Sequence, residues 1–152
     1  MRRSRRWTEL DDRGSAALEF IVVGLLLLVP VVYLVVSLGL IQGQSLGAEA
    51  GARHIARAIS TAADAHDAAS RADRVLSSVV DEYGLNSDTV SVSLSCSPAG
   101  GACPEAGAVL IVTVRTTVTL PLVPPVLGLD RFASIPIEAT AGQKVSRLWG
   151  SR

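Results

Sequence analysis

Residues 20–41 read FIVVGLLLLVPVVYLVVSLGLI, a run of 22 positions without a charged side chain. As an α-helix this run is about 33 Å long, at about 1.5 Å per residue, which matches the hydrocarbon core of a bilayer. The preceding residues 1–14 hold five arginines against three acidic side chains. By the positive-inside rule, we expect these residues to be cytoplasmic and the chain after Ile41 to lie on the other side of the membrane. That exported part has no basic stripe, so we expect no direct contact with nucleic acid.

Residues 42–84 predict a helix that continues from the membrane segment 15–41. The stretch contains no proline, and its second half has apolar residues at spacings of three and four, at Ala72, Val75, Leu76, Val79, Val80 and Tyr83. Gly84 is a plausible end of the helix. A weak point lies between 59 and 64, where Ser60 and Thr61 could break the helix or cap a second one.

Residues 85–145 predict a small antiparallel sheet of about three strands. The apolar period changes to two in TVSVSLSC, residues 89–96, and again in the Val- and Thr-rich stretch from Ala108 to Leu120. A third strand is expected around 134–143, where Pro136 indicates an edge or an irregular start of the strand. Between the second and third strands, PLVPPVLGL predicts an extended apolar connection, and residues 146–152 predict a flexible tail. The expected fold class is α+β, with one long N-terminal helix packed on this sheet.

Cys96 and Cys103 are the only cysteines, and both fall on the expected exported side. We expect a disulfide between them; the alternative is two reduced, unrelated thiols. A zinc site is a poorer interpretation, because His54 and His66 are distant in sequence and there is no second cysteine pair. We therefore predict neither a metal nor a cofactor.

The polar residues of the helical stretch do not assemble a recognisable catalytic motif. His54 and His66 are 12 positions apart, and Asp64 and Asp67 lie near the second histidine. No serine–histidine–aspartate arrangement, pair of catalytic carboxylates or phosphate-binding loop follows from these spacings. The sequence thus predicts a protein that is not an enzyme and has no small-molecule substrate.

The N-terminal segment admits three interpretations. A cleavable signal peptide would use the A-x-A site at 48–50, but its apolar core would be longer than the roughly 7–15 residues of such peptides. An ordinary signal anchor explains the arginines and the apolar run, but gives Gly14 and Glu19 no role. The third interpretation assigns a role to both residues.

The stretch RGSAALEF, residues 13–20, followed by an apolar helix, resembles the N-terminus of type IV pilin-like proteins. Together with GAEAGARHIARA at 47–58 and the Val- and Thr-rich strands, it resembles the TadE-like family, which comprises minor pilins or pseudopilins of the bacterial tight-adherence (Flp) pilus. The resemblance implies that a prepilin peptidase cuts between Gly14 and Ser15, leaving Glu19 at the fifth mature position. Family members often have a proline near this glutamate, whereas here the first proline of the helix is Pro30.

The resemblance also implies a charge pair that guides assembly. After cleavage, the new α-amine of Ser15 would be mostly cationic at neutral pH and would pair with Glu19 of a neighbouring subunit. The alternative is that Glu19 only extends toward the cytoplasmic interface of the membrane.

Four glycines stand four positions apart, at Gly39, Gly43, Gly47 and Gly51. Each glycine costs a helix about 1 kcal/mol relative to alanine, so their presence indicates a compensating close contact. One interpretation is packing on another pilin-like helix. The other is flexibility at the membrane exit, or packing within the same chain.

We therefore expect a single-pass inner-membrane protein with its N-terminus in the cytoplasm and its C-terminal domain outside. The pilus is an open second location. Its expected function is that of a minor pilin or pseudopilin that takes part in assembling a tight-adherence pilus through helix–helix association. The expected partners are the membrane, a prepilin peptidase, other minor pilins, the major pilin and the pilus secretion apparatus. The alternative is an uncleaved, membrane-anchored envelope protein with a small exported binding domain.

Overall fold

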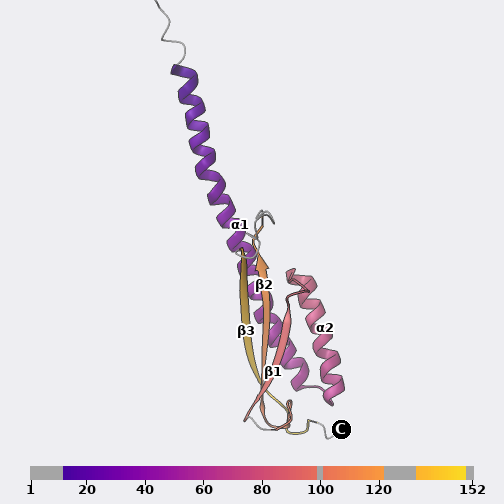
Figure 1. The fold of residues 1–152 in the computed structure, drawn as a ribbon. Coiled ribbons are helices and arrows are strands. Elements are labelled where there is room, and N and C mark those ends of the chain that lie inside the picture. The colour runs from indigo at the N-terminus through magenta and orange to yellow at the C-terminus, as the bar shows by residue number, and fades with distance from the viewer. Residues whose placement is uncertain (1–11, 99–100, 122–132, 150–152) are drawn as a thin grey trace, which may run out of the picture. The chain divides into compact units, whose positions relative to one another are not determined.

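The computed structural model describes residues 12–98, 101–121 and 133–149, with side chains from residue 16 onward. The elements are α1 (Asp12–Ser60), α2 (Ala65–Tyr83), β1 (Ser91–Ser97), β2 (Val109–Thr119) and β3 (Ser134–Lys144) (Figure 1). The predicted α+β class is confirmed. Most of the predicted leader, nearly all of the proline-rich connection and the last residues of the predicted tail lie outside the described residues.

The chain divides into two units, Met1–Leu38 and Gly39–Arg152. Helix α1 contributes to both. In the second unit, α1 from Gly39 onward and α2 pack against one face of the sheet, and the core lies between these layers.

Strand β2 supplies the centre of this core. Its buried side chains alternate along the strand with more exposed ones, as the period of two predicts. Those at Leu110, Val112, Val114 and Val118 are all 0–1% exposed. Opposite them, α1 contributes Ala48, Ala52, Ile55, Ala56 and Ile59, which are equally buried. The three alanines leave room for the helix to lie close to the sheet.

The sheet has the strand order β1-β2-β3 and is antiparallel throughout. In the β1–β2 hairpin Ser91 faces Arg115, and in the β2–β3 pair Arg115 faces Glu138. The Arg115 guanidinium donates two hydrogen bonds of 3.0 Å to the Glu138 carboxylate across the strands. Pro136 lies in β3, which is an edge strand as predicted, so its missing N–H removes no ladder bond from the middle of the sheet.

The helical stretch expected over 42–84 is interrupted, and the chain forms two helices there, α1 to Ser60 and α2 from Ala65. Helix α1 ends at Ser60, where the hydroxyls of Ser60 and Thr61 donate to the carbonyl of Arg57 at 2.9 and 3.0 Å. Side-chain hydrogen bonds of this kind compete with the backbone for helix continuation. The cap of α2 is Asp64, whose carboxylate accepts the backbone N–H of Asp67 at 2.8 Å. The break therefore falls inside the predicted weak point, but neither Ser60 nor Thr61 caps the second helix.

The other end of α2 follows the prediction. Gly84 is its C-cap, with φ of 61° in the left-handed region, and its N–H bonds to the carbonyl of Val80. The predicted apolar stripe of α2 faces the core, with Val79 buried and Ala72, Val75 and Leu76 partly buried against it.

Cys96 and Cys103 are joined by a disulfide. Cys96 lies in β1 and Cys103 in the loop that leads to β2, so the bond closes this loop onto the strand. Closing a loop of this size stabilises the fold by about 2.5 kcal/mol through the lost entropy of the unfolded chain.

Candidate functional site

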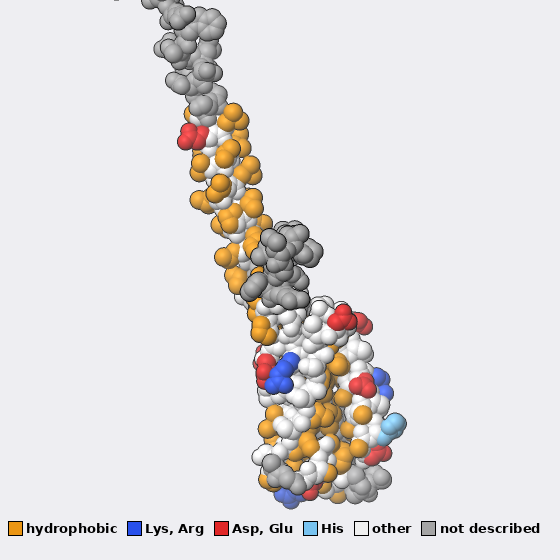
Figure 2. Space-filling view, in the orientation of Figure 1, with side chains coloured by type: hydrophobic (Ala, Val, Ile, Leu, Met, Phe, Trp, Pro, Cys, Tyr) orange, Lys and Arg blue, Asp and Glu red, His pale blue; other side chains and the backbone are white. Residues whose placement is uncertain are grey.

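The most extensive surface feature is the apolar segment of α1. Its large hydrophobic side chains from Leu18 to Leu40 are between 40% and 81% exposed. Figure 2 shows hydrophobic side chains along this helix. Among the described residues, α1 is the one helix long and apolar enough to cross a membrane. A surface this apolar requires either lipid or other helices around it, which is the property of a membrane anchor or a signal segment.

The predicted processing and pairing residues lie at the start of this segment. Helix α1 begins at Asp12, so the peptide bond between Gly14 and Ser15 belongs to its first turn. Glu19 follows one turn later, and its side chain is exposed. It is the one acidic or basic side chain between Ala16 and Ile41, a segment rich in Leu and Val.

The glycine stripe of α1 divides into two pairs. A Cβ atom added at Gly47 would lie 2.5 Å from Cβ of Tyr83, and one at Gly51 would lie 3.2 Å from Cγ1 of Val79. This pair therefore gives α2 of the same chain room to pack against α1. At Gly39 and Gly43, by contrast, an added Cβ would meet nothing within 4 Å among the described residues. Of the four glycines, only Gly39 and Gly43 are therefore still expected to pack on a partner helix.

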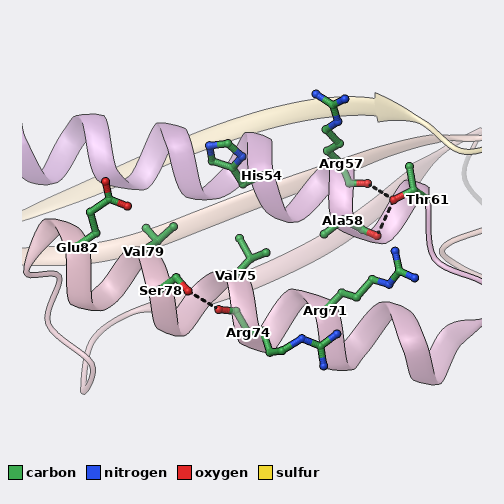
Figure 3. Close-up of a pocket in the computed structure, with 10 residues that line it drawn as sticks. All are labelled: His54, Arg57, Ala58, Thr61, Arg71, Arg74, Val75, Ser78, Val79 and Glu82. Atoms are coloured by element: carbon green, nitrogen blue, oxygen red, sulfur yellow. Dashed lines mark hydrogen bonds between the residues drawn. The ribbon is translucent and has the colours of Figure 1, made fainter.

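A groove of about 480 Å³ lies between α1 and α2 (Figure 3). The sequence analysis did not predict this groove. Val75 and Val79 of α2 point toward α1, and His54 of α1 also lines the groove. The charge of the groove changes from positive at one end to negative at the other. Arg57 and Arg71 lie toward the end where Thr61 is found, and Glu82 lies toward the opposite end.

Arg71 is partly neutralised by its own helix. Its Nε donates to the carboxylate of Asp67 at 2.8 Å. This hydrogen bond, together with the backbone N–H of Ala63, lowers the pKa of the Asp67 carboxyl below its ordinary value. Arg57 and Arg74 make no ion pair with any residue that the structure describes.

The polar residues considered for catalysis are not brought together. His54 lines the groove on α1, whereas Asp64 and Asp67 serve the N-terminal end of α2. Within residues 12–98, 101–121 and 133–149, no three His, Cys, Asp or Glu side chains are grouped closely enough to hold a metal ion.

No protein-family model, curated protein or solved structure matches the chain. The architecture itself is pilin-like, with a long N-terminal apolar helix and a second helix packed on a small antiparallel sheet of three strands.

Proposed function

We propose that this chain is a minor pilin or pseudopilin of the TadE-like type, which takes part in assembling a tight-adherence pilus through association of its N-terminal helix. In this proposal a prepilin peptidase removes residues 1–14, and the protein is held in the inner membrane with its second unit outside. It acts by binding other pilins and the secretion apparatus, without turnover chemistry. The coarse architecture supports the proposal, because it combines an apolar N-terminal helix with a small α+β domain.

The observation that carries the proposal is the position of Glu19. An ionised carboxylate at the centre of a membrane helix costs about 2.5–3.5 kcal/mol on insertion scales, and less near the interface. Glu19 is exposed on the helix, and no described side chain pairs with it. A cation from outside the chain would remove this cost.

Cleavage after Gly14 supplies such a cation. The α-amine of Ser15 has an ordinary pKa near 8, so it is mostly protonated at neutral pH. It stands four residues before Glu19 on its own chain. An amine on a neighbouring copy could meet Glu19 when two apolar helices lie side by side, and the pair would then set their register.

Cleavage would also act on a structured segment. Because the bond between Gly14 and Ser15 lies in the first turn of α1, that turn has to open before a peptidase can reach it. Helix ends fray readily, since their first N–H groups have no partner within the helix.

Mass spectrometry of the intact protein from membranes of cells that make a prepilin peptidase tests the proposal. We expect a mature chain that starts at Ser15. The matched control is the same chain in cells without the peptidase, where residues 1–14 should remain. An intact leader in both cells would overturn the proposal and would favour an uncleaved membrane-anchored domain.

A further inference from the structure

The groove between α1 and α2 is lined by three arginines and by Glu82. Arg57 and Arg74 form no ion pair with a described residue, and the groove has an apolar floor of Val75, which is partly exposed, and Val79, which is buried. A groove that combines guanidinium groups with apolar side chains fits a partner segment that is acidic and partly apolar.

The C-terminal end of α2 has the opposite charge. Asp81 and Glu82 lie in its last turn, which contains no basic residue. The carbonyl groups at this end make it the negative end of the helix dipole, where carboxylates are unfavourable and cations are favourable. The carbonyl of Gly84 accepts a hydrogen bond from the neutral side chain of Gln44 at 3.2 Å, and Asp88 follows in the next turn.

The C-terminal end of α2 departs from the usual placement of charges on a helix, whereas Asp67 in the first turn follows it. Arg71 and Arg74 lie in the middle of α2, and Asp81 and Glu82, which form no ion pair with a described residue, lie at the end where arginines would be stabilising. Deviations from a local rule without compensation inside the domain are expected at functional surfaces.

We infer that the acidic end of α2 in one copy of this chain docks into the arginine-lined groove of another copy. The arginines of the groove and the acids Asp81 and Asp88 outside it have opposite charge, and both sets belong to the second unit, so a single chain carries both halves of the contact. Because the surfaces differ, the contact is heterologous, and repeated contacts of this kind extend into an open assembly instead of a closed dimer. The inference rests on the proposed assembly function and names the second contact, besides the apolar helices, that would join the subunits.

Site-specific photocrosslinking in membranes tests this inference with the full chain. A photoreactive amino acid at Ser78, whose exposed side chain lines the groove, should capture a second copy. The crosslinked peptide from that copy should contain Asp81 or Asp88. The yield should fall in about 1 M salt, where the screening length is about 3 Å.

Charge reversal provides the specific test. The double variant Arg57→Glu with Arg74→Glu should reduce the yield of crosslinked dimer about tenfold, as should Asp81→Arg with Asp88→Arg. A tagged copy with the reversed groove, expressed together with a copy that has the reversed acidic end, should recover the crosslink. Recovery of the crosslink would show that the double variants still fold, because misfolded chains could not form the contact again.

Two single charge reversals, each with half the charge change of a double variant, serve as controls. Lys144→Glu lies on β3 outside the groove, and Asp73→Arg lies on an exposed part of α2. Both should leave the yield unchanged.

The outcomes separate this inference from the proposed function. Absence of a crosslink to a second copy, in cells where the chain is processed to Ser15, overturns the docking and leaves the pilin proposal in place. Capture of a different protein from the groove likewise overturns it. A crosslink that responds to charge reversal in a chain that keeps its leader supports the docking and refutes the proposed processing.

Discussion

Replacing Gly47 by alanine tests how closely α2 packs on α1. The added Cβ would lie 2.5 Å from Cβ of Tyr83, a distance too short for two carbon atoms, and Tyr83 Cβ moves only if the helix backbone moves. Overpacking of this kind costs about 1–3 kcal/mol. Alanine in place of glycine also gains about 1 kcal/mol of helix propensity, so the two effects of Gly47→Ala oppose each other and a matched control is needed to separate them.

Gly43→Ala is the matched control that removes this ambiguity. It gains the same helix propensity, but its Cβ meets no described atom within 4 Å. The difference between the two variants is therefore the overpacking cost, about 2 kcal/mol, with Gly47→Ala the less stable. At about 4 °C per kcal/mol this corresponds to about 8 °C in Tm.

Thermal unfolding of the full chain in detergent micelles, followed by near-ultraviolet circular dichroism, measures this difference. Hydrogen exchange should also be faster in the amides of α2 in Gly47→Ala than in Gly43→Ala. Equal unfolding temperatures and equal exchange would refute the close packing of Tyr83 on Gly47. The glycine pair would then have no internal role.

Three further predictions concern charges and the disulfide. Glu19→Ala should leave membrane insertion intact but reduce assembly, measured as piliation or as crosslinking between N-terminal helices, because the amine of the neighbouring subunit loses its partner. Asp67→Asn should lower the Tm at neutral pH, and the difference from the parent chain should disappear as the pH falls below about 4. The reason is that Arg71 lowers the pKa of the folded carboxyl, so its contribution is present above the unfolded pKa and is lost on protonation. Reduction of the bond between Cys96 and Cys103 should destabilise the second unit by about 2.5 kcal/mol in denaturant unfolding.

Each of these predictions has a result that contradicts it. Normal piliation with Glu19→Ala would exclude the charge pair, and Glu19→Asp serves as the control that keeps the charge. A stability difference for Asp67→Asn that does not shrink as the pH falls further below the ordinary pKa of the carboxyl would show that its effect is not electrostatic. Unchanged denaturant midpoints after reduction would show that the loop is held by other contacts.

The sheet was predictable because its signal is local. Every second residue of β2 is buried. The alternation of apolar and polar residues in 108–120 predicts this burial pattern without knowledge of the partner strands. Pro136 likewise indicates an edge on its own, since a missing N–H excludes a central position whatever the neighbours are. The apolar stripe and the Gly84 end of α2 follow from the same kind of local rule.

The helix break and the contact partners of the glycine stripe were less predictable, because both depend on how segments distant in sequence pack together. Asp64 and Ser60 both have side chains that can cap a helix, and the choice between them depends on where the chain must turn so that α2 reaches the core. The spacing of the glycines identifies a close contact, but Tyr83 and Val79, which occupy it at Gly47 and Gly51, are about 30 residues away in sequence. The groove between α1 and α2 could not be foreseen, because it exists only after that turn is made.

The position of β2 at the centre of the core has a consequence for biosynthesis. The apolar face of α1, with Ile55 and Ile59, is made about 50 residues before the β2 side chains such as Val112 that cover it. At roughly 5–20 residues per second, this face waits several seconds for its partner during translation. Helix α2 is made in the interval, and its Ala68 and Val79 can shield part of the face at once. The two helices are thus the part of the nascent chain that a holding chaperone would be expected to meet before the strands arrive.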